Sequence, residues 1–194
     1  MPGVAGVDEA VGPSEKAAVR TRARAQRRAR ASIDAQGLAT NALAFLGGIA
    51  GPARTTCYVS YGTEPPTGPM IEALESADFT VLLPRVKGDD LDWVDSRGAR
   101  SVSAMGIEEP TGPGVPLLPV RALLIPALAV DLTGGRIGKG GGFYDRVLAT
   151  LPADVPVAAI VGDDDIVDEI PLEPHDRPVD ALITPSRIVW VSHT

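Results

Sequence analysis

A glycine-rich segment that follows an apolar stretch constrains this chain more than any other feature. Residues 125–130 are almost entirely apolar, and the next twelve residues contain six glycines together with Arg136 and Lys139. Residues 143–146 then open a predicted helix. Glycines allow backbone N–H groups to approach an anion closely, and a helix N-terminus adds a partial positive charge. The segment therefore predicts a loop that binds a polyphosphate, with the nearby carboxylate available to a divalent metal.

Alternatives to this interpretation are weak. A Walker loop requires glycine and Ser or Thr where this chain has Thr133 and Gly140. The dinucleotide-binding pattern fails because Phe143 stands where a third glycine is needed. A flexible linker rarely carries basic, aromatic and acidic residues between a buried strand and a helix.

Length and composition predict one domain, residues 15–194, after a disordered tail of residues 1–14 that is rich in small and acidic residues. No apolar run approaches 18 residues, and the N-terminus lacks a secretory pattern. We expect no membrane association. The single cysteine, Cys57, excludes an internal disulfide, is interpreted as a buried core thiol, and fits a cytoplasmic protein.

Basic residues are concentrated near the N-terminus, although the net charge is −7. Residues 16–30 hold seven of the 18 basic residues, and Lys16, Arg20, Arg24 and Arg27 share one face of a predicted helix. This face is either solvated or directed toward a bound polyanion. The acidic remainder of the chain argues against nucleic-acid binding.

Short apolar segments separated by helices predict an α/β fold: a single three-layer α/β/α domain with a mainly parallel sheet. The expected strands are 56–60, 80–83, 121–130, 157–161 and 181–184, and the expected helices are 14–35, 40–46, 67–77 and 144–151. A hairpin of 91–94 with 101–105 is also expected. Ligands bind at the carboxyl ends of parallel strands, so Glu64, the glycine loop and Asp163 should meet at one rim.

Five blocks of the chain resemble the 5-formyltetrahydrofolate cyclo-ligase family, also called methenyltetrahydrofolate synthetase. In order, they are the basic helix with Lys16 and Arg20, YVSYGTEPPT, GIEEP (residues 106–110), IPALAVDLTGGRIGKGGGFYDR, and EPHDRPVDALITP (residues 173–185). The fourth block carries most of the resemblance. It implies ATP-driven conversion of 5-formyltetrahydrofolate to 5,10-methenyltetrahydrofolate with Mg²⁺, releasing ADP and phosphate.

The resemblance also implies roles for individual residues. Val59 and Glu64 would contact the folate, and Asp145 and Asp176 would associate with magnesium. Within the glycine loop, Arg136, Lys139 and Tyr144 would be catalytic. The residues expected to bind ATP are Lys16, Arg20, Arg136, Ile137, Gly138, Lys139, Gly140, Gly141, Gly142, Phe143 and Tyr144.

Several interpretations stay open at this point. Asp145 is also placed to cap its helix, Asp176 is an ordinary loop acid, and His175 fits a turn. Met105, Phe143 and Asp163 depart from the family pattern around the folate pocket. One alternative is therefore a related enzyme with the same ATP site and another amide or pterin substrate. Another is a non-catalytic, nucleic-acid-associated protein that uses the basic helix. Oligomeric state is not predictable from this sequence.

Overall fold

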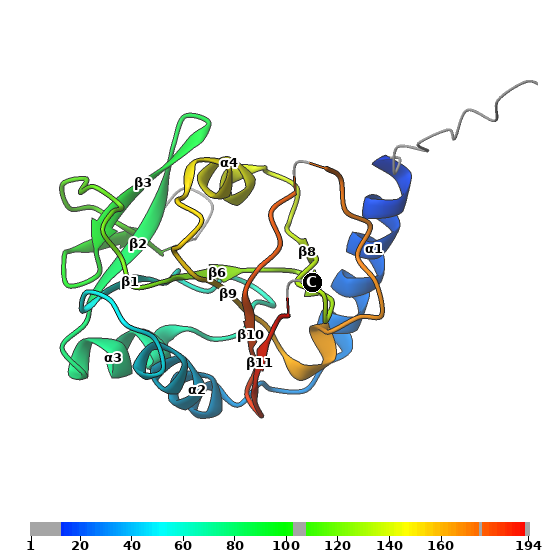
Figure 1. Cartoon of the computed structure of the whole chain (residues 1–194), viewed down its shortest axis with the longest axis horizontal. Helices are drawn as coiled ribbons and strands as arrows, with labels where there is room; N and C mark the ends of the chain where they lie inside the picture. Colours follow the sequence, from blue (N-terminus) through cyan, green and yellow to red (C-terminus); the bar gives the residue numbers. More distant parts are fainter. Residues whose placement is uncertain (1–12, 103–107, 175, 193–194) are drawn as a thin grey trace, which may run out of the picture.

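The computed structural model of the chain describes residues 13–102, 108–174 and 176–192. Two sheets lie edge to edge across the centre of the molecule (Figure 1). The first has the order β1-β2-β3, with β1 (Arg54–Thr56) parallel to β2 (Thr80–Lys87) and β3 (Asp90–Asp95) antiparallel to β2. The chain is therefore confirmed as an α/β protein.

The second sheet has the order β11-β10-β9-β6. Its strands β6 (Leu123–Pro126), β9 (Val157–Ile160) and β10 (Ala181–Ile183) are parallel, and β11 (Ile188–Trp190) is antiparallel at the edge. The mainly parallel, three-layer arrangement is not confirmed, because the sheets are mixed and two antiparallel ribbons accompany them. These ribbons are β4 (Arg100–Val102) with β5 (Glu108–Pro110), and β7 (Ala129–Val130) with β8 (Arg136–Ile137).

A seam of side-chain hydrogen bonds joins β1 to β6. The Thr55 hydroxyl donates to the Ala122 carbonyl at 3.0 Å, and the Thr56 hydroxyl accepts from the Leu124 amide at 3.0 Å. One backbone bond, from Arg121 N–H to the Arg54 carbonyl, adds to the seam. Because both threonines are fully buried, the two sheets act as one surface for packing.

Helices cover both faces of this surface (Figure 1). On one face, α2 (Ala35–Gly47) and α3 (Gly68–Ser76) bury Phe45, Met70 and Leu74 against the strands. On the other face, α4 (Phe143–Thr150) packs Leu148 against a second apolar cluster. The long helix α1 (Pro13–Ala29) lies at one end of the molecule.

Helix α1 is held by a smaller apolar cluster of its own. Val19 and Ala23 pack against Leu128 and Ile137 of the β7–β8 region. The short 3₁₀ helix η1 (Asp163–Asp165) lies beside the C-terminal half of α1 through ion pairs described below. None of the helices in the described part of the chain is long and apolar enough to cross a bilayer.

Some expected boundaries were wrong. The apolar run 121–130 is not one strand, because the chain leaves the sheet after Pro126 and β7 pairs with β8 instead. Here Leu128 N–H donates to the Ile137 carbonyl at 2.7 Å. The second helix begins at residue 35, because Asp34 accepts hydrogen bonds from the amides of residues 36 and 37. Strand β3 pairs with β2 rather than with residues 101–105, of which 103–105 lie outside the described residues.

Candidate active site

The glycine loop, residues 138–142, connects β8 to α4 and forms one wall of a cavity of about 340 Å³. Gly140 has φ +106° and Gly142, the N-cap of α4, has φ +68°. Both values lie in the left-handed region, which side chains rarely adopt, so the loop depends on glycine at these positions. The N-terminus of α4 borders the same cavity, which favours an anion there.

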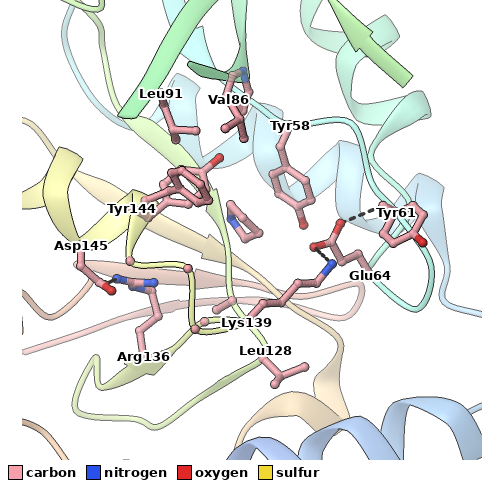
Figure 2. Close-up of a pocket in the computed structure, with 18 of the residues that line it drawn as sticks. Tyr58, Tyr61, Glu64, Val86, Leu91, Leu128, Arg136, Lys139, Tyr144 and Asp145 are labelled. Atoms are coloured by element: carbon pink, nitrogen blue, oxygen red, sulfur yellow. Dashed lines mark hydrogen bonds and ion pairs between the residues drawn. The ribbon is translucent and has the colours of Figure 1, made fainter. Parts of the chain in front are cut away.

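Two cations line the cavity, Arg136 in β8 and Lys139 in the glycine loop, and each is paired with an acid. Arg136 donates to the Asp145 carboxylate, and Lys139 Nζ lies 2.7 Å from Glu64 Oε1. Figure 2 shows the Arg136–Asp145 pair on one side of the cavity and Lys139 extending across it to Glu64. Lys139 Nζ also lies 5.3 Å from the centre of the Tyr61 ring. The acids therefore neutralise the charges that a phosphate ligand would need.

Glu64 is presented by the loop that follows β1. Tyr61 N–H donates to Glu64 Oε2 at 2.8 Å, which fixes the carboxylate. At the base of this loop, the Thr67 hydroxyl donates to the Tyr58 carbonyl and accepts from Ser60 N–H. Val59 lies in the cavity wall as well. The structure thus brings the residues expected at the folate opposite the residues expected at the phosphates.

Apolar side chains line two further sides of the cavity, and the sequence analysis did not predict them. Pro84, Val86 and Leu91 come from the β2–β3 hairpin, and Leu128 comes from the segment before β7. In Figure 2, Val86 and Leu91 lie on the opposite side of the cavity from Lys139 and Leu128. The expected strand 80–83 ended before Val86, so the pairing of Val86 with Leu91 across the β2–β3 hairpin was missed.

Helix α1 directs its basic face toward the rest of the chain. Arg20 Nε donates to the Gly138 carbonyl at 3.1 Å, and Arg24 donates to the Lys139 carbonyl at 3.2 Å.

Arg27 is buried and forms a bidentate pair with Asp165, at 2.9 and 2.7 Å. Arg30 pairs with Asp164 at 2.7 Å. The solvated-face alternative is wrong for Arg27, which is buried, whereas Arg24 is exposed and Arg20 is partly buried. Arg20 and Arg24 contact the glycine loop, and Arg27 connects α1 to η1.

Lys16 lies at the other end of α1. Its Nζ is 2.5 Å from Glu173 Oε2 and 2.8 Å from Asp176 Oδ2. Burial lowers the pKa of Lys16, but the hydrogen bonds to Asp176 and Glu173 outweigh burial and raise the pKa above its ordinary value. Lys16 therefore stays charged. Neither Lys16 nor Asp176 is among the residues that line the cavity.

The residues expected at the metal are not gathered into a cluster. Asp145 lines the cavity with its side chain 52% exposed, whereas Asp176 is held by Lys16 and by Glu173 N–H. Among the described residues there is no group of three or more His, Cys, Asp or Glu side chains that could hold a metal ion. Magnesium commonly takes only one or two carboxylates together with phosphates and water, so a metal that arrives with a nucleotide fits this arrangement.

Asp163 is not where it was expected. It does not line the cavity, and its Oδ1 accepts a hydrogen bond from the Ser186 hydroxyl at 2.5 Å. Burial raises the pKa of Asp163, but the hydrogen bonds from Ser186 and Thr184 outweigh it and hold the pKa below its usual value. Its neighbours Asp164 and Asp165 form ion pairs with Arg30 and Arg27. Met105 and His175 lie outside the described residues.

Three buried polar atoms of the cavity wall lack a hydrogen-bond partner within the described part of the chain: the Tyr58 and Tyr144 hydroxyls and Arg136 Nε. Buried polar groups are normally paired, so these atoms indicate where a ligand is expected. Burial raises the pKa of Tyr144, and the nearby Cys57 and Glu64 raise it further. Tyr144 therefore remains a neutral donor. Cys57 itself is a buried free thiol whose pKa burial raises to about 12.

The fold and the cavity define an α/β protein in which a glycine-rich loop with a lysine faces the carboxylate of Glu64 across a largely apolar pocket. Comparison with known proteins agrees with this class. The model of the 5-formyltetrahydrofolate cyclo-ligase family matches residues 13–185, and the chain belongs to that family. It is 37% identical over 186 residues to a 5-formyltetrahydrofolate cyclo-ligase of Mycolicibacterium smegmatis, covering 90% of this chain and 96% of the relative.

One further relative and two solved structures are less similar to this chain in sequence. A 5-formyltetrahydrofolate cyclo-ligase of Escherichia coli K12 is 32% identical over 69% of this chain and 78% of that protein. The solved 5,10-methenyltetrahydrofolate synthetase of Aquifex aeolicus superposes with a TM-score of 0.73 at 23% identity, covering 92% of this chain and 94% of that chain. The Mycoplasma pneumoniae enzyme of the same name gives a TM-score of 0.70 at 20% identity, over 87% and 98%. These two structures establish the likeness of fold.

Proposed function

We propose that this protein is an ATP-dependent 5-formyltetrahydrofolate cyclo-ligase that forms 5,10-methenyltetrahydrofolate and releases ADP and phosphate. The observation that carries the proposal is the meeting of Lys139 and Glu64 across one cavity. It joins a loop suited to phosphates with a carboxylate suited to the N–H groups of a pterin. Family membership supplies the substrate class.

The reaction needs help because a formamide oxygen is a poor leaving group. Transfer of the γ-phosphoryl group of ATP to that oxygen turns it into a phosphate ester, after which N10 attacks the formyl carbon and phosphate departs. Enzymes catalyse such phosphoryl transfers mainly by positioning the reactants and neutralising charge. Arg136 and Lys139 are the catalytic cations in this proposal. Both become available to phosphates once they leave Asp145 and Glu64.

The remaining contacts to ATP come from backbone groups and from α1. In this proposal, the N–H groups of the glycine loop and the first turn of α4 cradle the phosphates, with Ile137 and Phe143 at either end of the loop. Arg20 fixes the loop by its bond to Gly138. Lys16 adds a positive charge once it breaks its ion pairs with Glu173 and Asp176 and binds the nucleotide instead. The Tyr144 hydroxyl donates a hydrogen bond rather than acting as a base, because its pKa is raised.

The folate occupies the other half of the cavity. Glu64 has acceptor oxygens only, so it suits adjacent N–H donors of the pterin ring. Val59 and the apolar wall from the β2–β3 hairpin contact the rings.

Magnesium is part of the proposal, with Asp145 and Asp176 as the acids that would associate with it. When bound with ATP, the ion would neutralise charge on the phosphates. Asp145 is the better placed of the two, because it lines the cavity and is half exposed. We also propose that the enzyme acts in the cytoplasm, which a single buried thiol suits, and that residues 15–194 form its one domain.

One assay tests the proposal. The purified protein is incubated with ATP, Mg²⁺ and 5-formyltetrahydrofolate, and the near-ultraviolet absorbance of the methenyl product is followed with ADP release. We expect both signals to rise together and to require ATP. ATP hydrolysis without the methenyl product would favour a related enzyme with another amide or pterin substrate. Neither signal, in a folded protein, would overturn the proposal.

A further inference from the structure

A buried hydroxyl of the cavity wall has no role in the reaction described above. Tyr58 follows β1, its side chain is only 4% exposed, and it lines the cavity. Its hydroxyl oxygen is almost fully buried at the cavity wall and has no hydrogen-bond partner among the described residues. Its backbone carbonyl, by contrast, is bonded to the Thr67 hydroxyl. The backbone of Tyr58 is therefore anchored, while the polar end of its side chain is unsatisfied.

An unsatisfied buried hydroxyl destabilises the empty protein, so it needs a compensating partner. Figure 2 shows the hydroxyl end of Tyr58 directed toward the side of the cavity where Glu64 and Lys139 lie. Glu64 already bonds Tyr61 N–H and Lys139, and it makes no bond to Tyr58. A ligand in the cavity is therefore the group that can reach this hydroxyl.

The chemistry around the hydroxyl indicates what kind of atom it meets. Burial raises the pKa of Tyr58 well above its usual value, and the Glu64 carboxylate raises it further. The phenol is therefore a donor throughout the working pH range. Glu64, which only accepts, is the partner for N–H groups of the ligand, so the donor beside it suits an oxygen acceptor. A 5-formylated pterin offers two such oxygens, the ring carbonyl and the formyl oxygen.

We propose that the Tyr58 hydroxyl donates a hydrogen bond to a carbonyl-type oxygen of the bound 5-formyltetrahydrofolate. The proposal rests on the function proposed above and deepens it. Glu64 and Tyr58 then form a matched acceptor and donor on the folate side of the cavity. Tyr58 is a binding residue in this proposal, and it takes no part in proton transfer.

Tyr58→Phe tests the proposal by removing one oxygen atom from a buried ring. Because that oxygen is unsatisfied in the empty protein, the variant should melt at the same or a higher temperature than the wild type. Thr184→Val is the matched control, since it removes a buried hydroxyl that does have partners, the N–H and carbonyl of Arg187. That control should melt at a lower temperature but bind the folates and the ATP analogue as the wild type does.

Binding is then measured by calorimetry for 5-formyltetrahydrofolate, 5-methyltetrahydrofolate and a non-hydrolysable ATP analogue. Tyr58→Phe should bind the formyl compound roughly tenfold more weakly and the ATP analogue as well as the wild type does. An equal loss for the methyl compound assigns the bond to the pterin carbonyl, and a loss confined to the formyl compound assigns it to the formyl oxygen.

Two results would overturn the role of Tyr58: unchanged affinity of Tyr58→Phe for the formyl compound, or a melting temperature lowered as much as in Thr184→Val. Failure of the wild type to bind 5-formyltetrahydrofolate would instead overturn the proposed function. The two failures are therefore distinguishable in the same set of titrations.

Discussion

Lys139 and Glu64 form an ion pair of 2.7 Å that connects the glycine loop to the loop after β1 across the cavity. The Glu64 side chain is 10% exposed and the Lys139 side chain 51%. In the proposed function each residue serves a different ligand, so the pair must separate when ATP binds. Occupation of the nucleotide site therefore releases the carboxylate that the pterin needs.

The first prediction is that an ATP analogue strengthens the binding of 5-formyltetrahydrofolate. Partly exposed ion pairs contribute about 0.2–1 kcal/mol, so the affinity should rise by roughly two- to fivefold. Lys139→Met keeps the apolar stem and removes the charge, so this enhancement should disappear. Calorimetric titration of the folate with and without the analogue measures it. Lys87→Met, at an exposed lysine outside the cavity, is the control, and the same enhancement in Lys139→Met would exclude the coupling.

The second prediction concerns Arg136 and Lys139, the cations in and beside the glycine loop. Arg136→Ala and Lys139→Ala should each raise the KM for ATP and lower kcat, because each removes a charge-assisted bond to phosphate. Such bonds contribute about 1.5–3 kcal/mol, which corresponds to roughly tenfold or more. Steady-state kinetics give the values, and circular dichroism checks the fold. Arg22→Ala removes an exposed positive charge of α1 and should leave the kinetics unchanged. Ordinary kinetics in both loop variants would remove the phosphate-binding role.

The third prediction separates the metal role of Asp145 from helix capping. The N-cap of α4 is Gly142, and Asp145 uses its carboxylate for Arg136. If Asp145 associates with magnesium, Asp145→Asn should keep the fold but need several-fold more Mg²⁺ for half-maximal turnover. Asp176→Asn should show the same dependence and also loosen Lys16. Mg²⁺ titration of the rate decides, and an unchanged Mg²⁺ requirement in Asp145→Asn would end the metal assignment for that residue.

The fourth prediction concerns the buried pair that holds the C-terminal half of α1. Arg27 donates to Asp165 and to the Ala127 carbonyl, and both charged side chains are almost fully buried. Arg27→Met should lower the free energy of unfolding by about 3–5 kcal/mol, because it leaves Asp165 charged without its main partner. Urea denaturation measures the loss. Arg28→Met is the exposed neighbour and should change stability little, and equal effects of the two variants would contradict the buried-pair argument.

The sequence predicted the local part of the site well. The glycine loop and the loop of Glu64 were expected to meet at one rim, and Lys139 does pair with Glu64 in the cavity. The glycine loop reaches this place from the antiparallel β7–β8 ribbon rather than from a parallel strand. The resemblance to the family was confirmed by the family model and by the relatives. The roles of single residues at the site are still predictions.

Features that depend on distant partners could not be predicted. Arg27 meets Asp165, 138 positions further along the chain, and no local pattern distinguishes it from an exposed arginine. Asp163 was misplaced because three acids follow one strand, and sequence does not tell which of them turns toward Ser186. The run 121–130 is uniformly apolar, so periodicity could not show that the chain changes direction after Pro126.

The threonine seam between β1 and β6 has a consequence for how the enzyme is built. Strand β1 leads to the loop of Glu64, and β6 leads through β7 to the glycine loop. The lateral spacing of these strands is set by the hydroxyls of Thr55 and Thr56 rather than by a regular backbone ladder. In the proposed function, these two hydroxyls therefore help to set the distance between the folate and the ATP. A valine at either position would fill the same volume but would lose the hydrogen bond that sets the spacing of β1 and β6.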